Sequence, residues 1–156
     1  MTVFISGSRS IKQLDECIID NLRHYIKKNI HINIGDCYGL DSLVQSFLSQ
    51  LKYKNVTVYA TNGKARNNVG NWEIKNITSN YKEGTRDYYT EKDIAMSNDS
   101  DVAFVVWDGV SKGSYNNIVR MIRLHKIALV YEYKVDTSYI VQDFTDFISS
   151  SKYIRR

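Results

Sequence analysis

The chain has 156 residues, of which 43% are hydrophobic and 24% are charged. These are the proportions of one globular domain that buries a core of its own. The longest apolar run, Val102 to Trp107, is far shorter than the roughly 20 residues that a membrane helix needs. The composition therefore excludes a membrane-spanning helix.

The formal net charge is +4, and Lys152, Arg155 and Arg156 supply three of these charges, which leaves +1 for the rest of the chain (4 − 3). A nearly neutral body argues against nucleic acid as a partner, since a nucleic-acid-binding domain carries a basic face. With two cysteines and no secretory leader, we expect a cytoplasmic protein without disulfides. The absence of proline and the wealth of Asn, Lys, Ile and Tyr indicate a bacterium or a phage-infected host cell as its setting.

Strand-like and helical segments alternate along the first sixty residues. The expected elements are a strand at Thr2–Ser6, a helix over 10–26, a strand at His31–Gly35, a helix over 43–51 and a strand at Val56–Ala60. Ser10 and Gln13 have the spacing of a capping box, which marks the start of the first helix. Such alternation is typical of βαβ units and a mostly parallel sheet.

The segment from Thr61 to Thr85 interrupts this alternation with Asn, Gly and Lys, and its length predicts a functional loop or lid. Beyond it we expect a helix that Thr90 and Asp93 cap and that ends near Asn98, a strand at Asp101–Trp107, a helix from Ser114, a strand at Ile127–Tyr131 and a helix over 138–150. The Asp101–Trp107 strand is apolar without alternation, so it should lie centrally. The sequence predicts a single α/β domain, 1–156, with a Rossmann-like three-layer sandwich and a mostly parallel five-stranded sheet.

Glycine-bearing turns follow three of the expected strands, and their carboxyl ends meet at one edge of the sheet. The turns are Ser6–Arg9, Gly35–Asp41 and Trp107–Ser114. Amides at Gly7, Gly39 and Gly113 would cradle a phosphate at the start of the following helices. The alternative is that these glycines only allow tight strand-to-helix turns. Neither a Walker motif nor G-x-G-x-x-G is present, so neither a P-loop NTPase nor an ordinary dinucleotide dehydrogenase is supported.

A set of spaced motifs, in order, resembles the SLOG superfamily over residues 1–132, nearest to its YspA/YpsA-related branch. The motifs are Gly7-Ser8-Arg9, Gly35-Asp36-x-x-Gly39-x-Asp41, Arg66-Asn67-x-x-Gly70-x-Trp72, Lys92-Asp93-x-x-Met96 and Trp107-Asp108-Gly109-x-Ser111-x-Gly113-Ser114. The resemblance implies a nucleotide-binding Rossmann-like domain that pairs into a homo-oligomer. Distant relatives are the lonely-guy phosphoribohydrolases and DNA-processing protein A.

The chain departs from the lonely-guy pattern after Gly113, where Asn117 stands and no carboxylate follows. An amide cannot act as a general base or stabilise a sugar cation as a carboxylate does. We therefore expect binding of a nucleotide-derived small molecule, by a sensor or by a sequestering protein for a signalling nucleotide, which in a phage would counter host defence. The alternative is an N-glycoside hydrolase or ribosyltransferase, with Asp108 or Asp36 as the catalytic carboxylate.

The expected ligand-binding residues are Gly7, Ser8, Arg9, Gly35, Asp36, Gly39, Asp41, Arg66, Trp72, Trp107, Asp108, Gly109, Ser111, Gly113, Ser114 and Asn117. Arg9 and Ser114 would contact phosphate, and Asp36 or Asp108 would contact ribose. Arg66 and Trp72 would close over the ligand as a lid. For Asp41 the alternative role is a helix cap, and for Trp107 it is packing.

No metal or cofactor is expected, because His24, His31 and His125 lack metal-ligand spacing. Cys17, in the first helix beside its apolar stripe, should lie in the core. Cys37 should be a small residue tolerated in a tight turn. The identity of the ligand stays open.

Overall fold

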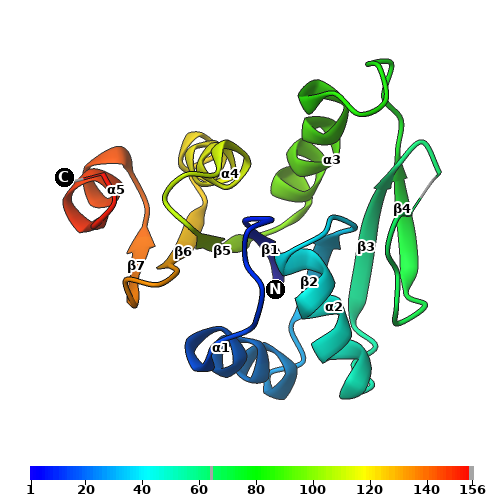
Figure 1. Ribbon diagram of the computed structural model, residues 1–156, viewed down its shortest axis with the longest axis horizontal. Coiled ribbons are helices and arrows are strands. Elements are labelled where there is room, and N and C mark those ends of the chain that lie inside the picture. Colours follow the sequence, from blue (N-terminus) through cyan, green and yellow to red (C-terminus); the bar gives the residue numbers. More distant parts are fainter. Residues whose placement is uncertain (64, 155–156) are drawn as a thin grey trace.

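The structure, a computed structural model, describes residues 1–63 and 65–154. Its elements are β1 (Thr2–Gly7), α1 (Glu16–Lys27), β2 (His31–Gly35), α2 (Leu40–Gln50), β3 (Val56–Thr61), β4 (Glu73–Ile77), α3 (Arg86–Asp99), β5 (Val102–Trp107), α4 (Lys112–Arg123), β6 (Ile127–Glu132), β7 (Thr137–Val141) and α5 (Phe144–Ser150). One sheet separates α1 and α2 from α3, α4 and α5 (Figure 1). This arrangement confirms the three-layer α/β architecture.

The sheet has seven strands in the order β4-β3-β2-β1-β5-β6-β7, so the prediction of five strands was wrong. All neighbouring pairs from β4 to β6 are parallel, and β7 pairs antiparallel with β6. The chain builds outward from β1 to β4 on one side and then from β5 to β7 on the other. Chain order therefore reverses beside β1, which is where ligands bind in open α/β sheets.

The two additional strands lie in segments with other predicted structures. β4 falls within the expected lid, and its residues are almost all exposed, so no buried apolar run marks it in the sequence. β7 occupies the start of the expected helix over 138–150, because Ile140 is an exposed strand residue and only Phe147 of that apolar series is buried. The last helix begins at Phe144, and Phe147 packs it onto the sheet beside Trp107.

Two predicted helix starts were wrong because the proposed capping side chains are engaged elsewhere. Asp15 caps α1, accepting from the Ile18 amide at 3.0 Å, whereas the Ser10 hydroxyl donates to Asp108 at 2.6 Å. Thr85 caps α3, and Thr90 lies inside that helix with its hydroxyl on the Arg86 carbonyl. Both helices thus start one turn or more away from the predicted capping boxes.

The core is divided by the sheet into two clusters. The first packs α1 and α2 against residues such as Ile5 and Ile34, and the second packs α3, α4 and α5 against residues such as Phe4 and Val105. Successive residues of β1 thus serve opposite cores, as expected of a strand covered on both faces. Among the described residues, no helix is both long enough and apolar enough to cross a membrane.

Candidate functional site

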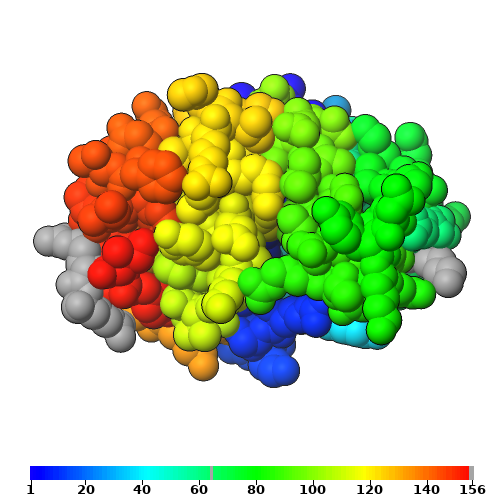
Figure 2. All heavy atoms as spheres, turned by 90° about the horizontal axis from the view of Figure 1, so that it is seen from above, coloured from blue at the N-terminus to red at the C-terminus, as the bar shows by residue number. Residues whose placement is uncertain are grey.

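A pocket of about 470 Å³ opens at the carboxyl ends of β1 and β2 and extends between α3 and α4 as far as Phe4 and Met96. In Figure 2 a recess separates the green atoms of α3 from the yellow atoms of α4, with blue N-terminal atoms at its end. Its exposed rim, called the pocket mouth below, contains Arg9, Ser10, Gly84, Arg86, Val110 and Gly113. Its deeper part, called the pocket floor, contains Ser6, Asp41, Lys92, Asp93, Ser114 and Asn117.

The fold brings together residues from all three glycine-bearing turns at this pocket. The predicted residues that line it are Gly7, Arg9, Gly35, Asp41, Asp108, Ser111, Gly113, Ser114 and Asn117. Those outside its lining are Ser8, Asp36, Gly39, Arg66, Trp72, Trp107 and Gly109. Turn position therefore located the pocket, but it did not separate residues that face the pocket from residues that support it.

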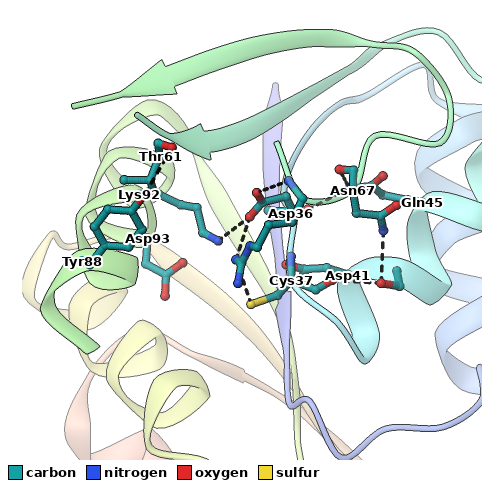
Figure 3. Close-up of polar contacts among 12 residues, drawn as sticks. Asp36, Cys37, Asp41, Gln45, Thr61, Asn67, Tyr88, Lys92 and Asp93 are labelled. Carbon is teal, nitrogen blue, oxygen red and sulfur yellow. Dashed lines mark hydrogen bonds and ion pairs between the residues drawn. The ribbon is translucent and has the colours of Figure 1, made fainter. Parts of the chain in front are cut away.

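Asp36 supports the floor from behind as the acceptor of a buried ion-pair network. Its carboxylate, 2% exposed, accepts from Lys92 Nζ at 2.8 Å and from Arg66 Nη2 at 2.8 Å (Figure 3). Burial alone would raise the pKa of Asp36, but the Arg66 hydrogen bonds and the Lys92 charge hold it below its usual value. Asp36 is thus a fixed anion whose lone pairs are committed to the protein, which does not suit a ribose contact or a catalytic base.

Arg66 anchors the segment after β3 instead of lying free above the pocket. Its backbone amide and its guanidinium both donate to Asp36, and the guanidinium lies over the Tyr89 ring at 4.4 Å from the centroid. Gln45 reinforces the anchor by donating to the Asn67 carbonyl and accepting from the Val69 amide. Residues 66–69 therefore follow a path fixed by α2 and α3.

Both tryptophans are packing residues. Trp72 is 9% exposed in the core cluster of α1 and α2, and its indole N–H donates to the Tyr53 carbonyl at 2.7 Å. It is not among the residues that line the pocket. Trp107 is 4% exposed between Tyr115, Phe147 and Tyr153, which agrees with its packing alternative.

Asp108, the other catalytic candidate, shapes the turn after β5. Its oxygens accept from the Ser10 hydroxyl, the Val110 amide and the Ser111 amide at 2.6 to 2.9 Å. Burial alone would raise its pKa, but these hydrogen bonds hold it below its usual value. Asp108 lines the pocket, yet its donors leave it the role of a turn-forming anion.

Of the three glycines expected to cradle a phosphate, the fold requires Gly7 and Gly39, whereas Gly113 faces open space. A Cβ on Gly7 would lie 2.1 Å from Leu40 Cδ2, so glycine is needed there for α2 to approach β1. Gly39 has φ +74° and packs against the Arg9 backbone, which is the tight-turn alternative raised from the sequence. At Gly113 nothing lies within 4 Å of an added Cβ. The first turn of α4 thus presents its backbone to the pocket mouth.

The sequence analysis missed the contribution of α3, which supplies Arg86, Tyr89, Thr90, Lys92 and Asp93 to the pocket. Lys92 and Asp93 stood in the family motif but received no site role. Burial alone would lower the pKa of Lys92, but Asp36 and the neighbouring anions raise it above its usual value, so the ammonium is charged. Lys92 is 3% exposed, and it places one fixed positive charge behind the floor.

Two carboxylates of the floor differ from Asp36 and Asp108 in being poorly supplied with donors. Asp41 Oδ2 accepts from the Cys37 amide at 3.2 Å, and Asp93 Oδ2 accepts from Asn117 Nδ2 at 3.4 Å. Burial raises the pKa of Asp41 to about 7 despite the Lys92 charge, and it raises the pKa of Asp93 as well. With a pKa of about 7, Asp41 can exchange a proton near neutral pH.

Cys37 lies at the pocket with two guanidinium groups beside its sulfur, Arg66 Nη2 at 3.3 Å and Arg9 Nη2 at 3.5 Å. Cys17 is partly buried against the first core cluster. Among the described residues, no group of three or more His, Cys, Asp and Glu side chains has the arrangement of a metal site.

No family model and no curated protein matches the sequence. A solved structure of DNA processing protein A from Helicobacter pylori is similar, with a TM-score of 0.67 and 14% sequence identity over 96% of this chain and 71% of that chain. That protein has a distinctive mode of binding single-stranded DNA. At this identity the likeness shows a shared fold, and DNA processing protein A is one of the distant relatives that the SLOG motifs implied.

Proposed function

We propose that this chain binds a nucleotide-derived small molecule in the pocket between α3 and α4, as a sensor or sequestering protein of the YspA/YpsA-related branch of the SLOG superfamily. The observation that carries the proposal is the pocket itself, at the point where strand order reverses. Such crevices at the carboxyl ends of parallel strands are the usual ligand sites of open α/β sheets. We place its action in the cytoplasm of a bacterium or a phage-infected cell.

The pocket mouth supplies what a phosphate group needs. Arg9 and Arg86 are exposed there, and neither pairs with a carboxylate among the residues that the structure describes. The amino-terminal turn of α4 adds the partial positive charge of its amides beside Gly113. An arginine pair and a helix start at one rim favour an anionic group over a neutral one.

Calorimetric titration with nucleoside monophosphates and diphosphates, ADP-ribose and cyclic dinucleotides tests the proposal. We expect at least one of them to bind, and we expect Arg9→Ala and Arg86→Ala each to weaken that binding roughly 10-fold, since each removes one charge-assisted contact. Arg23→Ala on α1, in the opposite helical layer, is the matched control and should bind as the unsubstituted protein does. Failure of the whole panel to bind would refute the proposal.

Assays on the same purified protein distinguish two other candidate functions. The raised pKa of Asp41, about 7, favours the N-glycoside hydrolase or ribosyltransferase alternative, since such a group transfers protons at neutral pH. Chromatography of the nucleotide after incubation decides, because release of free base supports hydrolysis and intact ligand supports binding. The similarity to DNA processing protein A makes single-stranded DNA the other rival. A gel-shift assay with oligonucleotides tests it, with no shift expected.

A further inference from the structure

The charged residues of the pocket are arranged by depth. The mouth holds the exposed Arg9 and Arg86, whereas Asp41 and Asp93 are partly buried in the floor, and Lys92 is almost fully buried behind them. A ligand that fills this pocket therefore meets positive charge at its outer end and carboxylates at its inner end.

The two carboxylates come from opposite helical layers. Asp41 is in the first turn of α2 and Asp93 is on α3, so they approach the floor from the two faces of the sheet. Figure 3 shows Asp93 on the α3 side of the Asp36–Lys92 pair and Asp41 on the α2 side. Both lie within electrostatic reach of Lys92, which is bound to Asp36.

Their acceptor capacity is largely unused by the protein. A carboxylate has about four lone-pair sites. From the described residues, Asp41 accepts one hydrogen bond, from the Cys37 amide, and Asp93 accepts one, from the Asn117 side chain. The Asn117 bond is long, at 3.4 Å, because that amide also donates to the Ser6 hydroxyl at 2.8 Å. The floor thus offers several acceptors to a ligand that brings donors.

The charge balance decides which donors fit. Lys92, Arg66 and Arg120 act electrostatically on this cluster of anions, which consists of Asp36, Asp41 and Asp93. The three cations equal the three carboxylates in number, and Asp41 is partly protonated at neutral pH, so the cluster has no excess negative charge for a cationic ligand group to offset. Neutral hydroxyl groups donate without changing the balance.

We infer that the pocket floor binds the sugar hydroxyls of the ligand, with Asp41 and Asp93 as acceptors for a ribose cis-diol, while the anionic end lies at the mouth on Arg9 and Arg86. This inference rests on the proposed nucleotide-binding function and narrows it to ribonucleotides with a free diol. A 2′-deoxyribonucleotide would leave one acceptor of the floor without its donor.

The test compares the four ribonucleoside 5′-diphosphates with their 2′-deoxy counterparts by calorimetry. We expect at least one ribonucleotide to bind roughly 10- to 100-fold more tightly than its deoxy form, which is the range for a hydrogen bond to a charged group. Asp93→Asn should reduce this ratio to less than about 3-fold by weakening the ribonucleotide alone, and Asp41→Asn is a second variant with the same expected direction. Asp20→Asn on the exposed face of α1 is the control that should keep the ratio.

Each outcome decides the inference. If the two sugar series bind with equal affinity, or if the deoxy series binds more tightly, the diol assignment is wrong while nucleotide binding stands. The assignment is also wrong if the ratio persists in both Asp93→Asn and Asp41→Asn. If neither series binds and no other nucleotide of the panel binds, the proposed function fails and this inference fails with it.

Discussion

At the scale of single residues, Asp41 is a carboxyl group whose ionisation the fold opposes. Its pKa is about 7 in the folded chain, against the ordinary value of 3.8. Because the folded state holds the proton more tightly, the stabilising contribution of protonated Asp41 is full below about pH 4. It is then lost as the pH rises through about 7. The pocket therefore carries a carboxylate that costs stability under neutral and alkaline conditions.

Asp41→Asn removes this cost while keeping an oxygen that can accept from the Cys37 amide. We expect the variant to gain stability relative to the unsubstituted protein as the pH is raised from 5 to 8. The gain should be on the order of 1–2 kcal/mol, after discounting for the partial exposure of the group. Urea unfolding at pH 5, 6, 7 and 8 measures it, with Asp20→Asn as the control. A difference that stays constant over this range would contradict the raised pKa.

From the sequence, only those site residues could be located that lie in turns directly after strands. Gly7, Arg9, Gly113 and Ser114 follow strand ends, so a parallel sheet was enough to gather them at one edge. Asp36 also follows a strand end, yet its carboxylate forms ion pairs with Lys92 and Arg66, which are both far from it in the chain. Which way a rim carboxylate points depends on such partners, and no local pattern contains them.

At the scale of secondary-structure elements, the Asp36 network joins the turn after β2, the segment before β4 and helix α3. Asp36→Asn would leave the Lys92 ammonium, 3% exposed, without its nearest counter-charge. We expect this variant to lose about 3–5 kcal/mol of unfolding free energy, as when one partner of a buried ion pair is removed. Chemical denaturation followed by circular dichroism is the measurement.

The control for that experiment is an exposed ion pair of the same chemistry. Lys75 and Asp99 lie 2.6 Å apart, but their side chains are 49% and 35% exposed. Lys75→Ala should therefore cost no more than about 1 kcal/mol. The double variant Asp36→Asn with Lys92→Met should recover part of the loss, because it removes the buried ammonium that would otherwise lack a counter-charge. Similar losses of unfolding free energy for the single substitutions at Asp36 and Lys75 would contradict the prediction that the buried ion pair stabilises the protein more than the exposed one.

The elements that the sequence predicted well are those with a buried apolar face. Strands such as His31–Gly35 were predicted with their observed bounds, and β5 was recognised as an inner strand from its unbroken apolar run. α3 was predicted too short because its buried residues include Lys92 and Ser97, which weaken the apolar stripe. β4 forms through backbone pairing with β3, and its exposed side chains carry no trace of that pairing.

At the scale of the whole molecule, the two core clusters share one sheet and should unfold together. Trp72 belongs to the cluster of α1 and α2, and Trp107 to the cluster of α3, α4 and α5. Because these are the two tryptophans of the chain, Trp107→Phe and Trp72→Phe each leave one fluorescent reporter, on opposite sides of the sheet. In each variant we expect the fluorescence transition in urea to coincide with the loss of far-ultraviolet circular dichroism.

The comparison is made within each variant, so that the destabilisation caused by the substitution itself cancels. Separate transitions in either variant would mean that one helical layer detaches before the other, against the prediction of a single cooperative domain. Coincident transitions in both would show that the layers depend on each other through β1 and β5.

The origin of Asp41 and Asp93 in opposite layers also bears on how an occupant could be discovered. Any compound seated between them would tie the two halves of the molecule across the end of the sheet, and it would have to leave before the chain could melt. Every true occupant should therefore raise the melting temperature of the entire protein, by an amount that grows with the logarithm of its concentration relative to its dissociation constant. A dye-based melting screen of metabolite extracts, fractionated until the shift follows one compound, would then identify the natural occupant without a prior guess at its structure.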